Sequence, residues 1–147
     1  MMNKSLFSSK TGEWSMPQDL FDKLDKIYGF DIDVCATKEN AKCPVFYTKE
    51  DDGLNQTWKG VCWMNPPYGR KIGDWVSKAY RVGMKGSTVV ALLPARTDTK
   101  WFHDYIYQQP GVTVTFLKGR LKFGGGKHAA PFPSMLVLFN RRFESLS

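Results

Sequence analysis

The sequence predicts a single-domain α/β protein with a mostly parallel β-sheet flanked by helices. Its 147 residues, 42% of them hydrophobic, suffice for one domain with one core. Through the middle of the chain, segments that predict strands alternate with segments of helical periodicity, as in α/β folds. The continuous apolar run at residues 88–93 is typical of a buried parallel strand. The last strands of the chain can still pair antiparallel.

Three segments predict helices: residues 17–28, 72–84 and 99–107. In the first, Leu20, Phe21, Leu24 and Ile27 recur at helical spacing. Pro17 suits the first turn of this helix, and the glycine that follows residue 28 suits its end.

Strands are predicted to end near residues 33–35 and to span residues 60–64, 88–93, 112–117 and 134–139. We expect Pro94 to stop the third of them. Residues 37–59 are polar and irregular, and residues 118–133, rich in Gly and basic residues, predict a mobile loop. We expect residues 1–10 to form a flexible tail. Residues 11–147 then form one domain, without a separate target-recognition domain.

Charge and cysteine usage limit the classes of function. The net charge is +7, which favours a polyanionic partner such as nucleic acid because phosphate contacts release counterions. No run of about 18 apolar residues is present, so we expect no membrane span. The three cysteines match no paired zinc pattern, and no metal is expected. They indicate a reducing compartment, the cytoplasm. The oligomeric state is left open.

The polar side chains that follow the predicted strands indicate where a ligand binds. Asp33, Asn65 and the segment 94–98 each follow a strand. In open α/β sheets, ligands bind outside the carboxyl ends of the strands. We therefore expect these three loops to converge on one cleft.

The four residues Asn65-Pro66-Pro67-Tyr68 carry the strongest chemical signal. The two prolines make the turn after the strand rigid. The Asn65 side-chain oxygen and the Pro66 carbonyl can then both accept hydrogen bonds from one amino group. Two such acceptors favour a pyramidal amine with its lone pair directed outward, and Tyr68 offers a flat face on which a base can stack. These four residues are the predicted catalytic set.

This motif resembles that of amino-methyltransferases, in which Asp or Asn, Pro-Pro and an aromatic residue bind the target amine. From about residue 9 to 143, the chain resembles the phage-type DNA N-6-adenine methyltransferase (Dam) family. The stretches that carry this resemblance lie at residues 13–18, 31–36, 39–43, 50–54, 63–70 and 93–99. The resemblance implies a Rossmann-like methyltransferase fold, S-adenosylmethionine as methyl donor, and a flipped adenine in DNA as acceptor. It also implies a phage or prophage origin, and hence a bacterial host cytoplasm.

Two departures from family patterns affect the donor site. The family usually has Thr-Pro where this chain has Met16-Pro17. The Phe-x-Gly-x-Gly loop common in methyltransferases is replaced by residues 33–36. We therefore expect acidic residues and the segment 14–17 to hold the donor. The predicted donor-binding residues are Trp14, Ser15, Met16, Pro17, Asp33, Cys35, Ala36, Asp51, Asp52 and Asn65.

Several of these assignments have an ordinary structural alternative. Asp51 and Asp52 precede a glycine, and an acidic turn before glycine is common without any ligand. Trp14 packs either on the donor or on the core. The predicted DNA-binding residues, whose cations would grip phosphates around an extruded base, are Arg70, Lys71, Arg96, Arg120 and Lys122.

Three other functions remain open from the residues alone. The same four-residue chemistry serves N4-cytosine methylation, and it also serves methylation of a glutamine amide in a protein. The net charge of +7 argues against a protein substrate. A non-catalytic DNA-binding relative that binds no donor is the third alternative.

Overall fold

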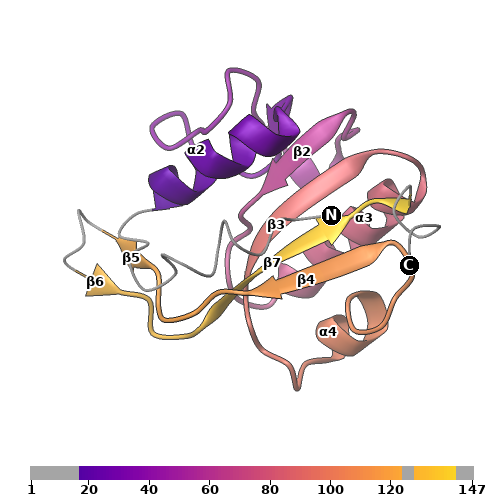
Figure 1. Cartoon of the computed structure of the whole chain (residues 1–147). Helices are drawn as coiled ribbons and strands as arrows, with labels where there is room; N and C mark the ends of the chain where they lie inside the picture. Colours follow the sequence, from indigo (N-terminus) through magenta and orange to yellow (C-terminus); the bar gives the residue numbers. More distant parts are fainter. Residues whose placement is uncertain (1–16, 124–127, 142–147) are drawn as a thin grey trace.

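The computed structural model describes residues 17–123 and 128–141. Its helices and strands follow one another along the chain as Figure 1 shows. Their bounds are α2 Pro17–Tyr28, β1 Ile32–Asp33, the 3-10 turn η2 Gly53–Asn55, β2 Val61–Met64, α3 Ile72–Met84, β3 Thr88–Pro94, α4 Lys100–Tyr105, β4 Val112–Phe116, β5 Lys122–Phe123, β6 His128–Ala129 and β7 Ser134–Phe139. The predicted tail at residues 1–10 lies outside the described residues.

The predicted helices and the five main strands are confirmed, with small differences at their ends. Helices α2 and α3 have the predicted bounds, whereas α4 is shorter than predicted. Strand β3 runs through Pro94 instead of stopping before it, and Pro94 pairs with Ser134. Proline is tolerated there because it is the last residue of the strand, where its missing N–H costs little.

The five main strands form one mixed sheet in the order β1-β2-β3-β7-β4. The pairs β1–β2 and β2–β3 are parallel, whereas β7 is antiparallel to both β3 and β4. The two antiparallel ladders are the longer ones. The prediction of a mostly parallel sheet is therefore not confirmed. The α/β class is confirmed, and β7 is the one strand whose direction opposes the other four.

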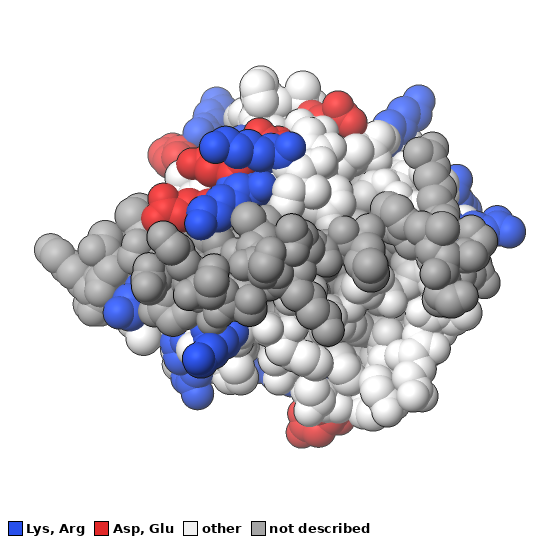
Figure 2. All heavy atoms as spheres, in the orientation of Figure 1, with Lys and Arg blue, Asp and Glu red and all other residues white. Residues whose placement is uncertain are grey.

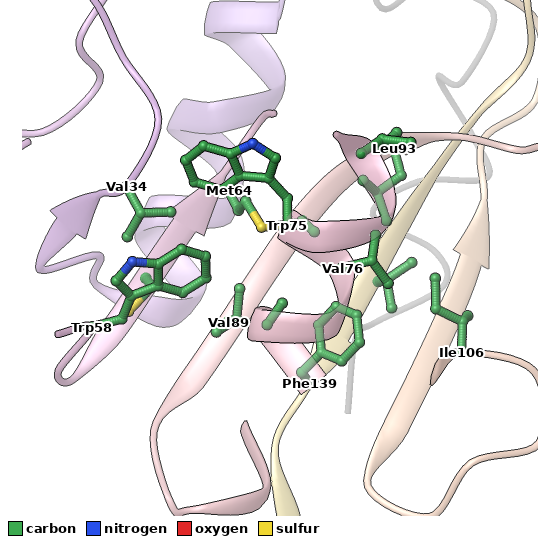
Figure 3. Packing of buried hydrophobic residues seen from close by; sticks show 14 of the residues in the cluster. Val34, Trp58, Met64, Trp75, Val76, Val89, Leu93, Ile106 and Phe139 are labelled. Carbon is green, nitrogen blue, oxygen red and sulfur yellow. The ribbon is translucent and has the colours of Figure 1, made fainter. Parts of the chain in front are cut away.

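Helices cover both faces of the sheet. Helix α3 packs on one face together with α4, and Figure 3 shows Trp75 and Val76 of α3 against Met64, Val89 and Phe139 of the sheet. This face also buries Trp58, whose indole stacks on that of Trp75 at 5.8 Å between ring centroids. The larger of the two buried hydrophobic clusters lies here.

Helix α2 covers the opposite face, in front of the sheet in Figure 1. Its buried side chains Leu20, Phe21 and Leu24 pack with Trp63 of β2 and with the residues of β3 and β7 that alternate with those facing α3. Because successive residues of a strand point to opposite faces, each central strand serves both clusters. The central strands are therefore buried on both sides.

The segment 118–133 carries structure that the sequence did not predict. Within it, β5 and β6 pair antiparallel, with Lys122 opposite Ala129. Leu121 and Ala130 are buried, and the Ala130 N–H donates to the Leu121 carbonyl at 2.7 Å. Leu121 packs with Leu117 in the cluster beneath α2. The prediction of a loop without regular structure is therefore wrong for the described part of this segment.

Candidate active site

One edge of the sheet gathers the loops that were predicted to converge. Strands β1, β2 and β3 are parallel, so they end at the same edge. The pairing of Pro94 with Ser134 places the start of β7 at this edge, and the pairing of Phe116 with Met135 places the end of β4 there. The Ala95 N–H donates to the Pro133 carbonyl at 2.9 Å. This edge thus joins the three predicted loops to the segment that precedes β7.

The Asn65-Pro66-Pro67-Tyr68 segment leaves β2 directly at this edge. Asn65 and Tyr68 are half-buried and Pro66 is buried. The Tyr68 hydroxyl donates a hydrogen bond to Oδ1 of Asn65 at 3.3 Å. Burial raises the pKa of Tyr68 to about 12, and the nearby charge of Arg96 opposes this in part. The hydroxyl therefore stays protonated and remains a donor at neutral pH.

This hydrogen bond leaves acceptor capacity at Asn65. A side-chain amide oxygen carries two lone pairs, and the Tyr68 hydroxyl uses one of them. The second remains for an N–H group of a bound amine. The arrangement can therefore hold an amine without breaking the Asn65–Tyr68 contact.

An aromatic residue outside the motif completes this part of the site. The ring of Phe132 meets the ring of Tyr68 edge to face, with centroids 5.1 Å apart and planes at 75°. The guanidinium of Arg96 lies 5.7 Å from the centroid of the Phe132 ring. The structure thus brings together Asn65, Tyr68 and Arg96, as the sequence predicted, and adds Phe132.

Sequence reasoning missed Phe132 because it was placed within a loop. Its signal was nevertheless present: an aromatic residue stands between Pro131 and Pro133 immediately before an apolar strand. Prolines on both sides restrict the backbone and so limit the directions that the partly buried side chain of Phe132 can take.

Asp33 lies beneath the loop that follows β1, and only 2% of its surface is exposed. Its carboxylate accepts hydrogen bonds from the backbone N–H of Cys35 at 3.2 Å and from that of Lys42 at 3.0 Å. Burial raises the pKa of Asp33, and the two hydrogen bonds oppose this. The carboxylate therefore shapes the 33–42 loop, a structural role that the sequence did not reveal. Its contact to the donor stays a prediction.

A cavity of about 770 Å³ adjoins this loop. Two of the predicted donor-binding residues, Ala36 and Asp51, line it. The partly buried ring of Phe46 also lines it, held beside β1 by the Asp33–Phe46 bridge. Two threonines and four further charged side chains complete its wall: Thr37, Thr48, Lys38, Glu39, Lys49 and Glu50.

The two acidic residues before Gly53 make local turn contacts. Oδ2 of Asp51 accepts from the backbone N–H of Thr48 at 2.8 Å and from its hydroxyl at 3.0 Å, and these bonds lower the pKa of Asp51. Asp52 has a left-handed backbone with φ of 56° and accepts from the side chain of Asn55 at 2.5 Å. Asp51 alone of the two lines the cavity. Any role of Asp52 in donor binding stays a prediction.

The predicted DNA-binding cations are all exposed. Arg70 and Lys71 stand between the motif and α3, Arg96 follows β3, and Arg120 and Lys122 precede and begin the β5–β6 hairpin. Figure 2 shows acidic side chains beside basic ones around α2, whereas basic side chains on the side of the hairpin have no acidic neighbour in view. The guanidinium of Arg120 also donates to the Ala130 carbonyl at 3.3 Å, a contact across the base of the β5–β6 hairpin.

Some predicted features lie outside the described residues. These are the predicted donor-binding residues Trp14, Ser15 and Met16. The other two donor-binding candidates not yet placed are described: Pro17 begins α2, and Cys35 is half-buried against the core on the α3 side. In residues 17–123 and 128–141, no group of three or more His, Cys, Asp or Glu residues is placed to hold a metal ion. No helix in these same ranges has the length and apolar character to cross a membrane.

The fold and the site define an α/β protein that presents an Asn-Pro-Pro-Tyr turn at the carboxyl edge of the parallel part of its sheet. Residues 4–145 match the family model described as DNA N-6-adenine-methyltransferase (Dam). The chain belongs to this family.

Individual relatives agree with this assignment. The chain is 32% identical to a DNA N-6-adenine-methyltransferase of Haemophilus phage HP1 over an alignment of 148 positions, which covers 95% of this chain and 85% of the relative. It is 38% identical to a DNA N-6-adenine-methyltransferase of Escherichia phage T1 over 60% of this chain and 38% of the relative. It is also 34% identical to the putative methyltransferase YfdM of Escherichia coli over 38% of this chain and 70% of the relative.

Replacement of Asp33 by asparagine is expected to lower the free energy of unfolding by about 1–3 kcal/mol. Asparagine keeps one acceptor but turns an amide N–H₂ toward the second backbone donor, so the N–H of Cys35 or of Lys42 loses its partner. Urea unfolding of the purified variant measures this loss. A variant as stable as the wild type would show that the two hydrogen bonds contribute nothing.

The difference in stability between the wild type and Asp33→Asn is expected to depend on pH. The folded-state pKa of Asp33 lies above its ordinary value of 3.8, so the folded state keeps the proton longer than the unfolded state does. The stability that protonation contributes is fully present below pH 3.8 and is lost as pH rises through the folded-state value. The stability of the wild type relative to Asp33→Asn should therefore fall with rising pH in this window.

Proposed function

We propose that this protein transfers a methyl group from S-adenosylmethionine to the exocyclic N6 amine of adenine in DNA. The observation that carries the proposal is the Asn65–Tyr68 pair at the carboxyl end of β2, where the Asn65 oxygen keeps a free lone pair beside an aromatic face. Membership of the Dam family and the phage relatives named for this reaction support the same conclusion.

The side chains act on the amine by hydrogen bonding. S-adenosylmethionine supplies an electrophilic methyl group when bound. Oδ1 of Asn65 and the Pro66 carbonyl accept the two N–H groups of the amine, which directs its lone pair away from these acceptors and toward the donor. The aromatic wall of Tyr68 and Phe132 then holds the plane of the base, since stacking on aromatic side chains tolerates any base but fixes its plane.

The residues around the cavity beside β1 suit the donor chemically. Phe46 offers an apolar face for an adenine ring, and Glu50 and Asp51 offer acceptors for ribose hydroxyls. Lys38 and Lys49 offer cations for a carboxylate. We assign the donor to this cavity, together with Ala36 and Cys35 from the predicted set. A Rossmann-like methyltransferase fold is part of this proposal, with β7 as its antiparallel strand.

A labelling experiment tests the proposed reaction. The protein is incubated with methyl-labelled S-adenosylmethionine and DNA duplexes with and without adenine, and the DNA is digested to nucleosides. Label in N6-methyladenine supports the proposal. Label in cytosine would assign the N4-cytosine alternative, and label in neither base would favour the non-catalytic alternative. Label in added protein would point to glutamine as the acceptor.

The proposal includes the organisation of the chain and its place of action. We infer that residues 11–147 act as one methyltransferase domain, in which parts of residues 37–59 and 118–133 contact the DNA sequence. Arg70, Lys71, Arg96, Arg120 and Lys122 hold the phosphates around the extruded adenine. The phage relatives support action in the cytoplasm of a bacterial host.

Replacement of Phe132 by alanine is expected to raise KM for DNA by about tenfold, within the range for loss of one stacking ring. The edge-to-face contact holds the Tyr68 ring in its orientation, and alanine removes that support. Steady-state kinetics with a short duplex measure the effect. Phe132→Tyr keeps the ring and should retain KM, whereas Phe116→Ala removes a more exposed ring that does not contact Tyr68. Equal effects at Phe132 and Phe116 would contradict a specific role.

A further inference from the structure

A second cluster of positive charge lies at the opposite edge of the sheet from Asn65. A cavity of about 450 Å³ opens here, between the loop that leads into β2, the start of β3 and the second half of α3. None of the described residues that line it is acidic, and several carry hydroxyl or amide groups. Its cationic lining residues are Lys59, Lys78, Arg81 and Lys85. We call it the rear basic cavity.

One of these cations is fixed by the protein itself. Nζ of Lys78 donates to the Leu54 carbonyl at 2.8 Å and to the Gln56 carbonyl, and it lies 5.1 Å from the centroid of the Trp58 ring. Lys78 therefore ties the loop before β2 to α3. Burial lowers its pKa, and the charge of Arg81 lowers it further, against a smaller opposing effect of Asp52. Arg81 thus adds positive charge beside Lys78, and the negative charge of Asp52 offsets this only in part.

The remaining cations face solvent from two separate elements. Arg81 lies three residues after Lys78 on the same face of α3, Lys85 directly follows the helix, and both are exposed. The carbonyl end of a helix favours cations, which accounts for part of this placement. It does not account for Lys59, which reaches the cavity from the loop before β2. Cations from two elements converge on one hollow.

The residues that line the rear basic cavity suit a phosphate group better than a nucleobase. Trp58 is only 3% exposed, and its ring stacks on Trp75, so no aromatic face is available for a nucleobase. The side chains of Gln56 and Thr57 add neutral polar groups around the cations, whereas the Ser87 hydroxyl donates to the Trp58 carbonyl at 3.3 Å. Such a surface contacts the nucleic-acid backbone and carries no sequence information.

We propose that the rear basic cavity binds backbone phosphates of a second DNA segment while a first segment occupies the edge at Asn65. The seven residues of β3 separate the two edges by about 23 Å at the usual rise per strand residue. DNA is stiff over roughly 150 base pairs, so a short duplex held in the cleft would have to bend around the sheet at a cost in free energy to reach the opposite edge as well. That the ligand is DNA rests on the proposed function.

A capture experiment tests this directly. Full-length protein is loaded onto an immobilised 20-base-pair duplex without methyl donor, unbound protein is washed away, and capture of a fluorescent second duplex is measured against salt. The variant Arg81→Gln/Lys85→Gln should capture the second duplex about 30-fold more weakly at 0.15 M salt, the effect of two lost phosphate contacts. The slope of log affinity against log salt should fall by about 1.8 for the same reason.

A matched control variant distinguishes loss of a specific DNA-binding site from a general loss of positive charge. Lys23→Gln/Lys26→Gln removes the same charge from α2, on the other face of the sheet, and should capture the second duplex as the wild type does. Equal melting temperatures of the variants establish that both fold. Equal capture by the wild type and Arg81→Gln/Lys85→Gln would overturn the proposal, and so would an equal loss in both double variants.

The result of the capture experiment does not depend on methyl transfer. Capture is measured without donor, so absence of N6-methyladenine in the labelling experiment would leave the capture result standing. Conversely, Arg81→Gln/Lys85→Gln should methylate a single short duplex at the wild-type rate. A combined loss of methylation and capture would place these residues in the first DNA site and overturn the second one.

Discussion

Replacement of Asn65 by alanine is expected to lower kcat for methyl transfer by about 10²–10³-fold, the usual effect of removing one preorganised hydrogen-bonding group from a reaction centre. In the proposed reaction the amide oxygen is the side-chain acceptor for the amine, and alanine removes it. The hydrogen bond from the Tyr68 hydroxyl is lost with it. Single-turnover kinetics with saturating donor and DNA measure the step.

Two control variants sharpen this prediction. Asn65→Asp keeps an acceptor oxygen at the same place and should retain much of the rate. Tyr68→Phe removes only the hydroxyl that donates to Asn65 and keeps the ring, so it should cost less than Asn65→Ala. If Asn65→Ala kept the wild-type rate while its melting temperature was unchanged, the assignment of the reaction to this turn would be wrong.

Replacement of Trp63 by alanine is expected to lower the free energy of unfolding by about 3–5 kcal/mol. The side chain is 1% exposed, and its ring meets Phe21 at 5.3 Å and Phe30 at 5.6 Å between centroids. It is a large part of the contact between α2 and the sheet, so alanine leaves a cavity beneath the helix. Small proteins are stable by only about 5–15 kcal/mol, and the variant should therefore be close to unfolding at 37 °C.

Urea unfolding at 25 °C measures the effect of Trp63→Ala. Ile27→Ala is the matched control, because Ile27 lies on α2 but is 45% exposed, and its replacement should change stability by no more than about 0.5 kcal/mol. A loss below about 1 kcal/mol for Trp63→Ala would show that the interface beneath α2 repacks without a large cavity.

Local structure could be predicted wherever the sequence pattern that determines it lies within one segment of the chain. Helix α2 begins at Pro17 and ends at Tyr28, as predicted, and Gly29 has a φ of 65° that closes the helix with a hydrogen bond to the Asp25 carbonyl. The turn after β2 was equally visible, because its two prolines follow an apolar strand in the sequence itself.

The features that the sequence did not reveal depend on contacts between distant segments. The position of β7 between β3 and β4 is set by pairing of residues that are far apart in the chain, and an apolar run does not encode its neighbours. Asp33 resembled an exposed ligand-binding acid, because its partner Lys42 donates from nine residues away. Phe132 meets Tyr68 only once β7 is in place beside β3.

The central position of β7 has a consequence for synthesis on the ribosome. Strand β7 is the last of the described strands to be made, yet β4 has no other partner in the sheet. Until residues 134–139 have left the ribosome, β3 and β4 both expose unpaired edges, and unpaired edges are prone to aggregation. The sheet can close only after this strand emerges, so the nascent chain is open to edge-to-edge pairing with other chains until its last described strand is made.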